Sequence, residues 1–325
     1  MPNSASSTQP APGLFRQTPP GIFPPVLGLF GLGLAWRRAA EVFGSPTDLA
    51  ELILGAVSLL FVFCVIAYLA KFLRDPGVLL RDLKILPGRA GLSGASAAGL
   101  LFAATLIPYG ACAAQVALML GLTAHAVVAF AVVWVLLPAP LPQRRITPIW
   151  HLTFVGFIVA PLAAIPLGAV QMSEVILFVT MPLAATIWIG HLVVSRARGV
   201  PAPLRPALSI HLAPLCLFGI VGAMLGHMVL AQIFGWLAVI VIAVLIVRVR
   251  YLTASGFSPF WGAFTFPMAA FANLMLILSP DNDLFRLLGA ISLGAASIVV
   301  PVIAYRIMKL WSSGKLAVIT NAARI

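Results

Sequence analysis

Five histidines are the ionisable residues that lie deep in apolar stretches of this chain: His125, His151, His191, His211 and His227. An imidazole exchanges protons near neutral pH, so these side chains are candidates for proton transfer or metal binding. They form no H-x-x-x-H or H-x-x-E pair, and the sequence has neither a Ser/His/Asp set nor a glycine-rich phosphate loop. We therefore expect no enzyme, no metal and no cofactor, and a lone histidine is interpreted first as a packing residue.

Three prolines recur at a fixed interval inside apolar runs. Pro161, Pro214 and Pro267 stand in "FIVAPLAAIPLG", "IHLAPLCLFGIVG" and "AFTFPMAAFANLM", each 53 residues from the next. A proline inside a helix removes a backbone hydrogen bond and costs about 3 kcal/mol. The bulky ring of Phe266 directly precedes the third proline. Because 53 residues equal two membrane crossings with their loops, the repeating unit is predicted to be a helical hairpin.

The composition places these runs in a membrane. Of 325 residues, 62% are hydrophobic and 9% charged, and the mean hydropathy is +1.09. A soluble domain carries about 25% charged residues. Long apolar runs also exclude a transmembrane barrel, whose strands alternate over about 10 residues. The net charge of +12 comes from short basic clusters between apolar runs, so no nucleic-acid partner is expected.

Apolar runs bounded by charges, Pro and Gly predict an all-α integral membrane protein with ten transmembrane helices. The predicted spans are 21–37, 50–72, 88–108, 111–136, 147–168, 171–195, 206–228, 229–249, 256–278 and 285–310. Residues 1–20 are expected to form a disordered cytoplasmic tail, residues 21–311 the transmembrane domain, and residues 312–325 a short cytoplasmic tail.

Loop charges orient the predicted spans. Seventeen basic residues fall on the side that holds the N-terminus, whereas Arg37, Arg38 and Arg286 fall on the other. Under the positive-inside rule, this charge asymmetry places both termini in the cytoplasm, which requires an even number of spans. We expect the protein to lie in the inner membrane of the cell. No carboxylate lies in the middle of any span.

The odd-numbered spans carry the helix breakers. Besides the three prolines, the first span contains Pro24, Pro25 and Gly28, and the third contains Gly94. Kinked, Gly-rich helices belong where neighbours or a water-filled cavity satisfy their freed backbone groups. The second and tenth spans are interpreted as straight, uniformly apolar helices that face lipid. We therefore predict five hairpins with the odd helices around a central pore. The alternative is that the prolines only shape packing, since proline is common in membrane helices.

Four stretches resemble a known family: "PPGIFPPVLGLFGLGLAW", "PIWHLTFVGFIVA", "RPALSIHLAPL" and "WGAFTFPMAAFAN". In order and spacing they resemble the tellurite-resistance/dicarboxylate transporter family, which includes TehA-like proteins, fungal malate transporters and the slow-type anion channels of plant guard cells. The resemblance spans about residues 19–311. It implies five hairpins around one pore per subunit, and a homotrimer.

The resemblance also implies roles for single residues. The aromatic residue of the T-F-P-M motif occludes the pore in the family, and that position is Phe266 here. His151 matches a histidine of some plant members, whereas His211 does not correspond to a family feature, and Pro24 replaces a common glycine. Phe23, Phe264, His151 and His211 are further candidates for pore lining, although either phenylalanine would equally suit helix packing.

The residues themselves favour small anions, inorganic ions or dicarboxylates, as the cargo. Without mid-span acids the passage has no carboxylate ring to select cations, and the basic cytoplasmic mouth would concentrate anions. We expect Phe266 to gate as a hydrophobic constriction and Pro267 to fix the bend beside it. Two alternatives stay open: a proton-coupled dicarboxylate or tellurite-type oxyanion carrier that uses the histidines and, more remotely, a membrane enzyme.

Overall fold

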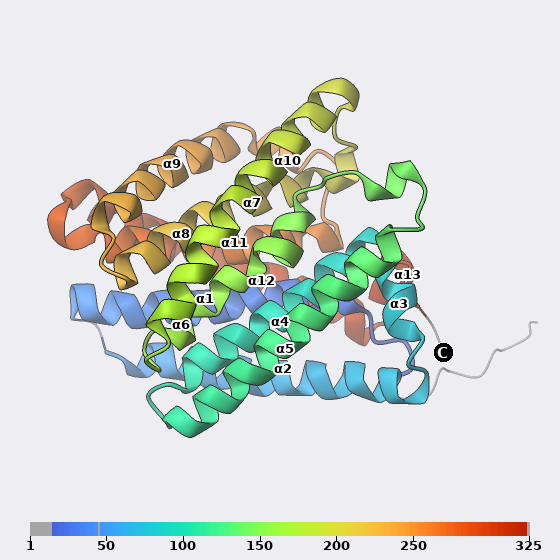
Figure 1. Cartoon of the computed structure of the whole chain (residues 1–325), viewed down its shortest axis with the longest axis horizontal. Coiled ribbons are helices and arrows are strands. Elements are labelled where there is room, and N and C mark those ends of the chain that lie inside the picture. Colours follow the sequence, from blue (N-terminus) through green and yellow to red (C-terminus); the bar gives the residue numbers. More distant parts are fainter. Residues whose placement is uncertain (1–14, 45, 324–325) are drawn as a thin grey trace, which may run out of the picture.

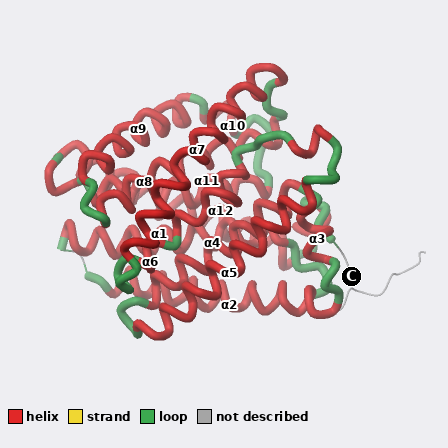
Figure 2. The backbone as a smooth tube through the Cα atoms, in the orientation of Figure 1, coloured by secondary structure: helices red, strands yellow, loops and turns green. Residues whose placement is uncertain are grey.

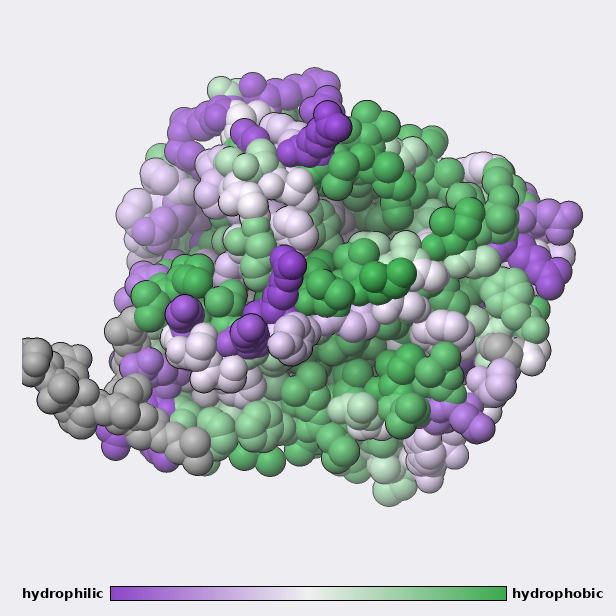
Figure 3. All heavy atoms as spheres, turned by 180° about the vertical axis from the view of Figure 1, so that it is seen from behind, coloured by the Kyte–Doolittle hydropathy of each residue, from purple (hydrophilic) through white to green (hydrophobic). Residues whose placement is uncertain are grey.

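The computed structural model describes residues 15–44 and 46–323, and they are overwhelmingly helical. Helices make up 83% of the structure, and none of these residues forms a strand (Figures 1 and 2). The predicted all-α class is therefore confirmed. Hydrophobic side chains cover the middle of the face in Figure 3, and most hydrophilic ones gather toward its two sides, as expected for a protein whose middle lies in lipid.

Nine helices of more than ten residues build the described part of the chain. They are α1 (Phe23–Phe43), α2 (Asp48–Arg74), α4 (Leu86–Leu106), α5 (Ala111–Leu136), α7 (Val170–Arg198), α8 (Leu212–Met224), α9 (Met228–Val247), α11 (Gly262–Ile277) and α12 (Asp283–Ser312). Shorter α-helices are α3 (Val78–Leu83), α6 (Pro161–Ala164), α10 (Val249–Leu252) and α13 (Lys315–Ile319). The remaining turns are η1 (Pro20–Ile22), η2 (Leu141–Arg144), η3 (His151–Val155), η4 (Gly156–Val159), η5 (Ala202–His211), η6 (Pro259–Trp261) and η7 (Ser279–Asp281).

Seven helical segments of the described chain are long and apolar enough to cross a membrane. They coincide with seven of the ten predicted spans, the exceptions being the first, third and fifth. The first and third correspond to α1 and α4, each 21 residues long and hence about 30 Å. The fifth corresponds to a shorter apolar stretch, His151–Ala164. The difference arises because α1 carries charges and α4 is rich in Gly and Ala.

Helix α1 runs past its predicted end at residue 37. Arg37 is tolerated within the helix because its Nε lies 2.6 Å from Glu51 Oε1 of α2. Its guanidinium also donates to the Thr105 carbonyl at 3.0 Å. The charge at the predicted boundary is instead paired with the neighbouring helix, in an ion pair whose side chains are both partly exposed.

The helical segments fall into two groups by burial. In five outer helices, between 22% and 33% of the most apolar 18-residue stretch is buried; these helices are α2, α5, α7, α9 and α12. Two long inner segments, Ala202–Met224 and Pro259–Ile277, bury 78% and 67%. More than half of the residues of α1 and α4 are also buried. In Figure 1, α2 and α5 lie along one edge of the molecule and α9 along the opposite edge, with α1, α8 and α11 between them.

The inner segments contact one another in a closed cycle. Helix α1 contacts α4; α4 contacts η3, η4 and α6; η4 contacts α8; α8 contacts α11; and α11 contacts α1. We call these five segments, α1, α4, η3–α6, η5–α8 and η6–α11, the inner ring. Every member is one of the odd-numbered predicted spans.

Most inner-ring segments change helix type shortly before their proline. The 3₁₀ turn η1 precedes Pro24, the π-turn η3 and 3₁₀ turn η4 precede Pro161, η5 precedes Pro214, and η6 precedes Pro267. A proline has no N–H to donate to the carbonyl one turn back. A 3₁₀ or π turn before the proline therefore loses less hydrogen-bond energy than a regular α-helix would. The kinks therefore occupy the residues ahead of each proline.

The tenth predicted span, interpreted as a straight helix, contains a proline, and so does another outer helix. Pro182 lies inside α7 and Pro301 inside α12. Both side chains are exposed, in contrast to the buried Pro161, Pro214 and Pro267. A proline on the outer face of a membrane helix needs no room from a neighbour, so proline alone does not mark the inner ring.

Residues near both ends of the described part of the chain contact a buried ion pair. Lys71 Nζ lies 2.9 Å from Asp82 Oδ2, and both side chains have no exposed surface. The same lysine donates to the Thr18 carbonyl at 3.1 Å, and the Ala323 amide donates to Asp82 Oδ1 at 2.7 Å. Residues 1–14 of the predicted N-terminal tail lie outside the described residues, whereas Thr18, Pro19 and Pro20 are buried.

Candidate functional site

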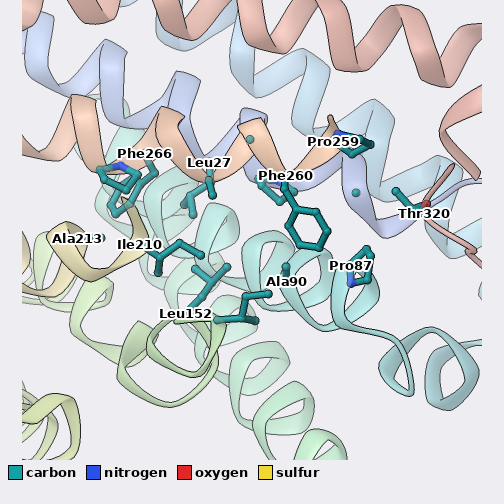
Figure 4. A pocket seen from close by; sticks show the side chains of 16 residues that line it. Leu27, Pro87, Ala90, Leu152, Ile210, Ala213, Pro259, Phe260, Phe266 and Thr320 are labelled. Carbon is teal, nitrogen blue, oxygen red and sulfur yellow. The ribbon is translucent and has the colours of Figure 1, made fainter. Parts of the chain in front are cut away.

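A cavity of about 60 Å³ lies inside the inner ring, and all five segments contribute to its wall. Its lining includes Pro24 and Leu27 of α1, Ala90 of α4, Leu152 of η3, Ile210 and Ala213 of η5–α8, and Phe266 and Pro267 of α11. Figure 4 shows Phe266 at one end with Leu27, Ile210 and Ala213, and Thr320, Pro87 and Pro259 at the other. We call this space the front cavity.

A second cavity of about 30 Å³, the rear cavity, continues inside the same ring. It shares Leu27, Leu152, Ile210, Ala213 and Phe266 with the front cavity. It adds His151, Pro214, Leu217 and residues of η4. One water needs roughly 10–15 Å³ of such volume, so the front cavity has room for about four to six waters and the rear cavity for about two or three.

Phe266 is the aromatic residue among the five described residues that line both cavities. The side chain is 7% exposed. The missing side chain of Gly31 makes room for it, since a Cβ on Gly31 would lie 3.1 Å from Phe266 Cδ2. Sequence reasoning missed Gly31; its place one turn beyond Gly28 in "GLFGLG" was the available signal.

Close contact between α1 and α11 sets the position of the Phe266 backbone. A Cβ on Gly28 would lie 2.2 Å from Thr265 Oγ1, a distance no real side chain tolerates. The same hydroxyl reaches the carbonyls of Pro24 at 3.1 Å and Gly262 at 2.7 Å. Gly28 is thus a packing glycine that lets the two helices touch directly before the Phe266 ring.

The structure places the other predicted residues in three environments. Pro24 and Pro267 line the front cavity, and Pro214 and His151 the rear cavity. Pro25 and Gly94 lie at helix contacts: Pro25 beside Gly262, and Gly94 beside Pro24. Pro161 is buried at the start of α6.

Two phenylalanines predicted as further lining residues lie away from both cavities. Phe23 packs edge-on against Tyr68, with ring centroids 6.3 Å apart, and lines a groove between α2, α4 and α5. Phe264 packs edge-on against Trp261 at 5.8 Å. Both rings therefore serve helix packing in the described conformation.

Residues 17–308 match the family described as voltage-dependent anion channel (SLAC1). The chain belongs to this anion channel family. The match covers the whole inner ring and confirms the family suggested by the four sequence stretches. No curated protein sequence matches the chain. Membership makes it a multi-pass membrane protein of an anion channel and transporter class.

This family member also contains a linear chain of three histidines. His151 Nε2 lies 3.0 Å from His211 Nδ1, and His211 Nε2 lies 2.9 Å from His191 Nδ1. The rings come from η3, η5 and α7, and the two pairs are 60 and 20 residues apart in sequence. Sequence reasoning named all three residues singly, but their spacing gave no sign that they meet.

A basic pocket of about 390 Å³ opens beside His191. Its charged lining residues are Lys84, Arg89, Arg145 and Arg198, and no Asp or Glu occurs among the described residues that line it. Arg89 is 6% exposed. It donates to the Gln143 carbonyl at 3.3 Å, and its Nε is buried without a partner. A buried, partly unsatisfied guanidinium among cations is an electrostatic attraction for anions.

Proposed function

We propose that the chain is an anion channel in which small anions cross along the axis of the inner ring, with Phe266 as the gate. The observation that carries the proposal is that Phe266 supplies the aromatic ring among the five residues that line both the front and the rear cavity. An apolar ring in a narrow lumen breaks the water column, so a hydrated ion stops there until the ring moves.

The charges of the protein support anions as the cargo. No Asp or Glu lines either cavity among the described residues, and the basic pocket brings four cationic side chains together. The cavity walls are almost wholly apolar, so discrimination among anions would follow size and hydration energy. Inorganic anions, dicarboxylates and oxyanions such as tellurite are the substrates to compare.

We infer that ten helical segments cross the inner membrane as five hairpins, with both termini in the cytoplasm. The charge asymmetry of the loops and the even number of segments support this topology. The protein is expected to assemble as a homotrimer with one passage per subunit. Terminal fluorescent-protein fusions test the topology, and light scattering of the purified protein measures its assembly.

Replacement of Phe266 by alanine tests the gate. In planar bilayers we expect Phe266→Ala to raise the chloride or nitrate current by at least about tenfold, because the constriction loses its ring. Phe264→Ala is the matched control: it removes the same ring from the same helix outside both cavities. A Phe266→Ala protein that folds normally and stays closed would refute the gate.

A proton-coupled carrier for dicarboxylates or oxyanions is the second candidate function. The specific observation in its favour is the hydrogen-bonded chain of three histidines that ends at the rear cavity. Flux that requires a proton gradient would support the carrier, whereas ohmic current without one would support the channel.

A further inference from the structure

The three-histidine chain connects two spaces that are otherwise separate. His191 lines the basic pocket, and His151 lines the rear cavity, where it is 2% exposed. His211 lies between them and uses both ring nitrogens in hydrogen bonds to the other two. His151 Nδ1 is buried and has no partner, so the inner end of the chain has a free position.

The geometry suits proton transfer better than metal binding. A metal site needs ligands that converge on one point, and no group of three or more such ligands occurs among the described residues. In a linear chain each imidazole accepts a proton on one nitrogen and releases one from the other. Chains of His, Asp and Glu inside membranes act as proton relays for this reason.

We propose that His191, His211 and His151 form a proton relay from the basic pocket to the rear cavity beside Phe266. A proton from water binds His191 Nε2, and the proton on His191 Nδ1 passes to His211 Nε2. The proton on His211 Nδ1 then passes to His151 Nε2, and His151 Nδ1 releases its own proton. One proton enters from water in the basic pocket and one leaves to water in the rear cavity, so the charge balances. Each ring is left as its Nε2–H tautomer, and exchange of protons with water returns it to the Nδ1–H form.

The charges around the three-histidine chain make the entry of a proton depend on an anion in the basic pocket. His191 faces Lys84, Arg89, Arg145 and Arg198 across the basic pocket. Because like charges repel, a proton on His191 is unfavourable until an anion occupies the pocket. His151 contacts Trp188 of α7. His125 of α5 is the nearest other histidine to η3–η4; it is hydrogen-bonded to Ser96 and does not belong to the three-histidine chain. Beyond His151, the rear cavity is lined by apolar residues.

The inference rests on the proposed anion pathway, and one experiment separates the two. Liposomes that contain the purified full chain and the pH dye pyranine receive an inward nitrate gradient, with potassium and valinomycin clamping the voltage. Nitrate uptake and internal pH are recorded together. We expect the wild type to acidify the lumen as nitrate enters.

The central variant is His211→Gln, which keeps hydrogen-bonding groups but cannot relay a proton. We expect its proton flux to fall to less than about a tenth of the wild type, while nitrate uptake stays within about twofold. His191→Gln should lose proton flux in the same way, and it replaces His211→Gln in the test if that variant folds poorly. His227→Gln is the control, because His227 is half-exposed beside Glu174 and outside the chain.

Wild-type nitrate uptake without acidification, or unchanged acidification in both relay variants, would overturn the relay and leave the anion pathway intact. Absence of nitrate uptake in both the wild type and Phe266→Ala would instead overturn the proposed function. The two failures are therefore distinguishable in the same assay.

Discussion

Two segments of equal mean hydropathy, α7 (Val170–Arg198) and η5–α8 (Ala202–Met224), have opposite surroundings. The first buries 28% of its most apolar window and the second 78%. Hydropathy therefore identifies a helix that belongs in a membrane but does not tell lipid from protein neighbours, because lipid tails are as apolar as a core. What separates the two segments is the backbone: η5–α8 begins with ten residues of 3₁₀ helix, and α7 is α-helical throughout.

The largest effect of a substitution on stability is expected at a residue of an outer helix that is buried instead of exposed. Lys71 lies on outer helix α2, yet it is completely buried against Asp82. Removing one partner of a buried ion pair costs about 3–5 kcal/mol, because the other charge is left without compensation. Lys71→Met should therefore lower the melting temperature of the detergent-solubilised protein by about 10 °C.

The double variant Lys71→Met/Asp82→Leu is the matched control for this prediction. Replacing both charges by apolar groups removes the unpaired carboxylate, so a large part of the lost melting temperature should return. An equally unstable double variant would show that the contacts of Asp82 with Tyr68 and the Ala323 amide, rather than the charge pair, dominate.

Glycine-to-alanine substitutions in the inner ring and in the outer helices should change the stability of the protein in opposite directions. At Gly28 of the inner ring, a Cβ would lie 2.2 Å from Thr265 Oγ1, whereas at Gly55 of outer helix α2 nothing lies within 4 Å. Overpacking costs about 1–3 kcal/mol, and an unhindered Gly to Ala change in a helix gains about 0.5–1 kcal/mol. Gly28→Ala should lower the melting temperature and Gly55→Ala should raise it slightly. Equal responses would contradict the assignment of inner and outer helices.

Replacement of a proline by alanine is expected to change stability least. At an inner-ring position it should still change anion conduction. Pro214→Ala restores an N–H that favours regular helix over the 3₁₀ turn η5, and this would shift Ile210 and Ala213 in both cavity walls. We expect unitary anion conductance to change by about two- to tenfold. Pro182→Ala in α7, an exposed position, should leave conductance unchanged. The prediction fails if the two variants conduct alike.

Much of the fold was predictable because local rules govern it. Apolar runs located every long helix, and the regular interval between Pro161, Pro214 and Pro267 was enough to identify three inner-ring segments. A predicted boundary failed where a charge is paired with the neighbouring helix, as at Arg37 with Glu51. The tenth span was interpreted as straight although it contains Pro301; exposure rather than proline content distinguishes the inner and outer helices.

The site was only partly predictable, because contacts between distant residues leave no local trace. Phe266 was recognisable from its motif, and the structure gives it a place in both cavities. Gly31, which makes room for the ring, and the pairing of His211 with both His151 and His191 depend on how the segments pack. Phe23 looked equivalent to Phe266 by type, but the rotation of α1 turns it toward Tyr68.

The contact between α1 and α11 joins the beginning of the chain to a region some 240 residues later, as in the hydrogen bond from Thr265 to Pro24. During synthesis the first helix therefore waits in the bilayer without its principal neighbour until the ninth segment has left the ribosome. The bond from Ala323 to Asp82 spans a similar separation and forms later still. Chains truncated before residue 277 should consequently insert into the membrane yet remain open on one side, exposed to quality-control proteases.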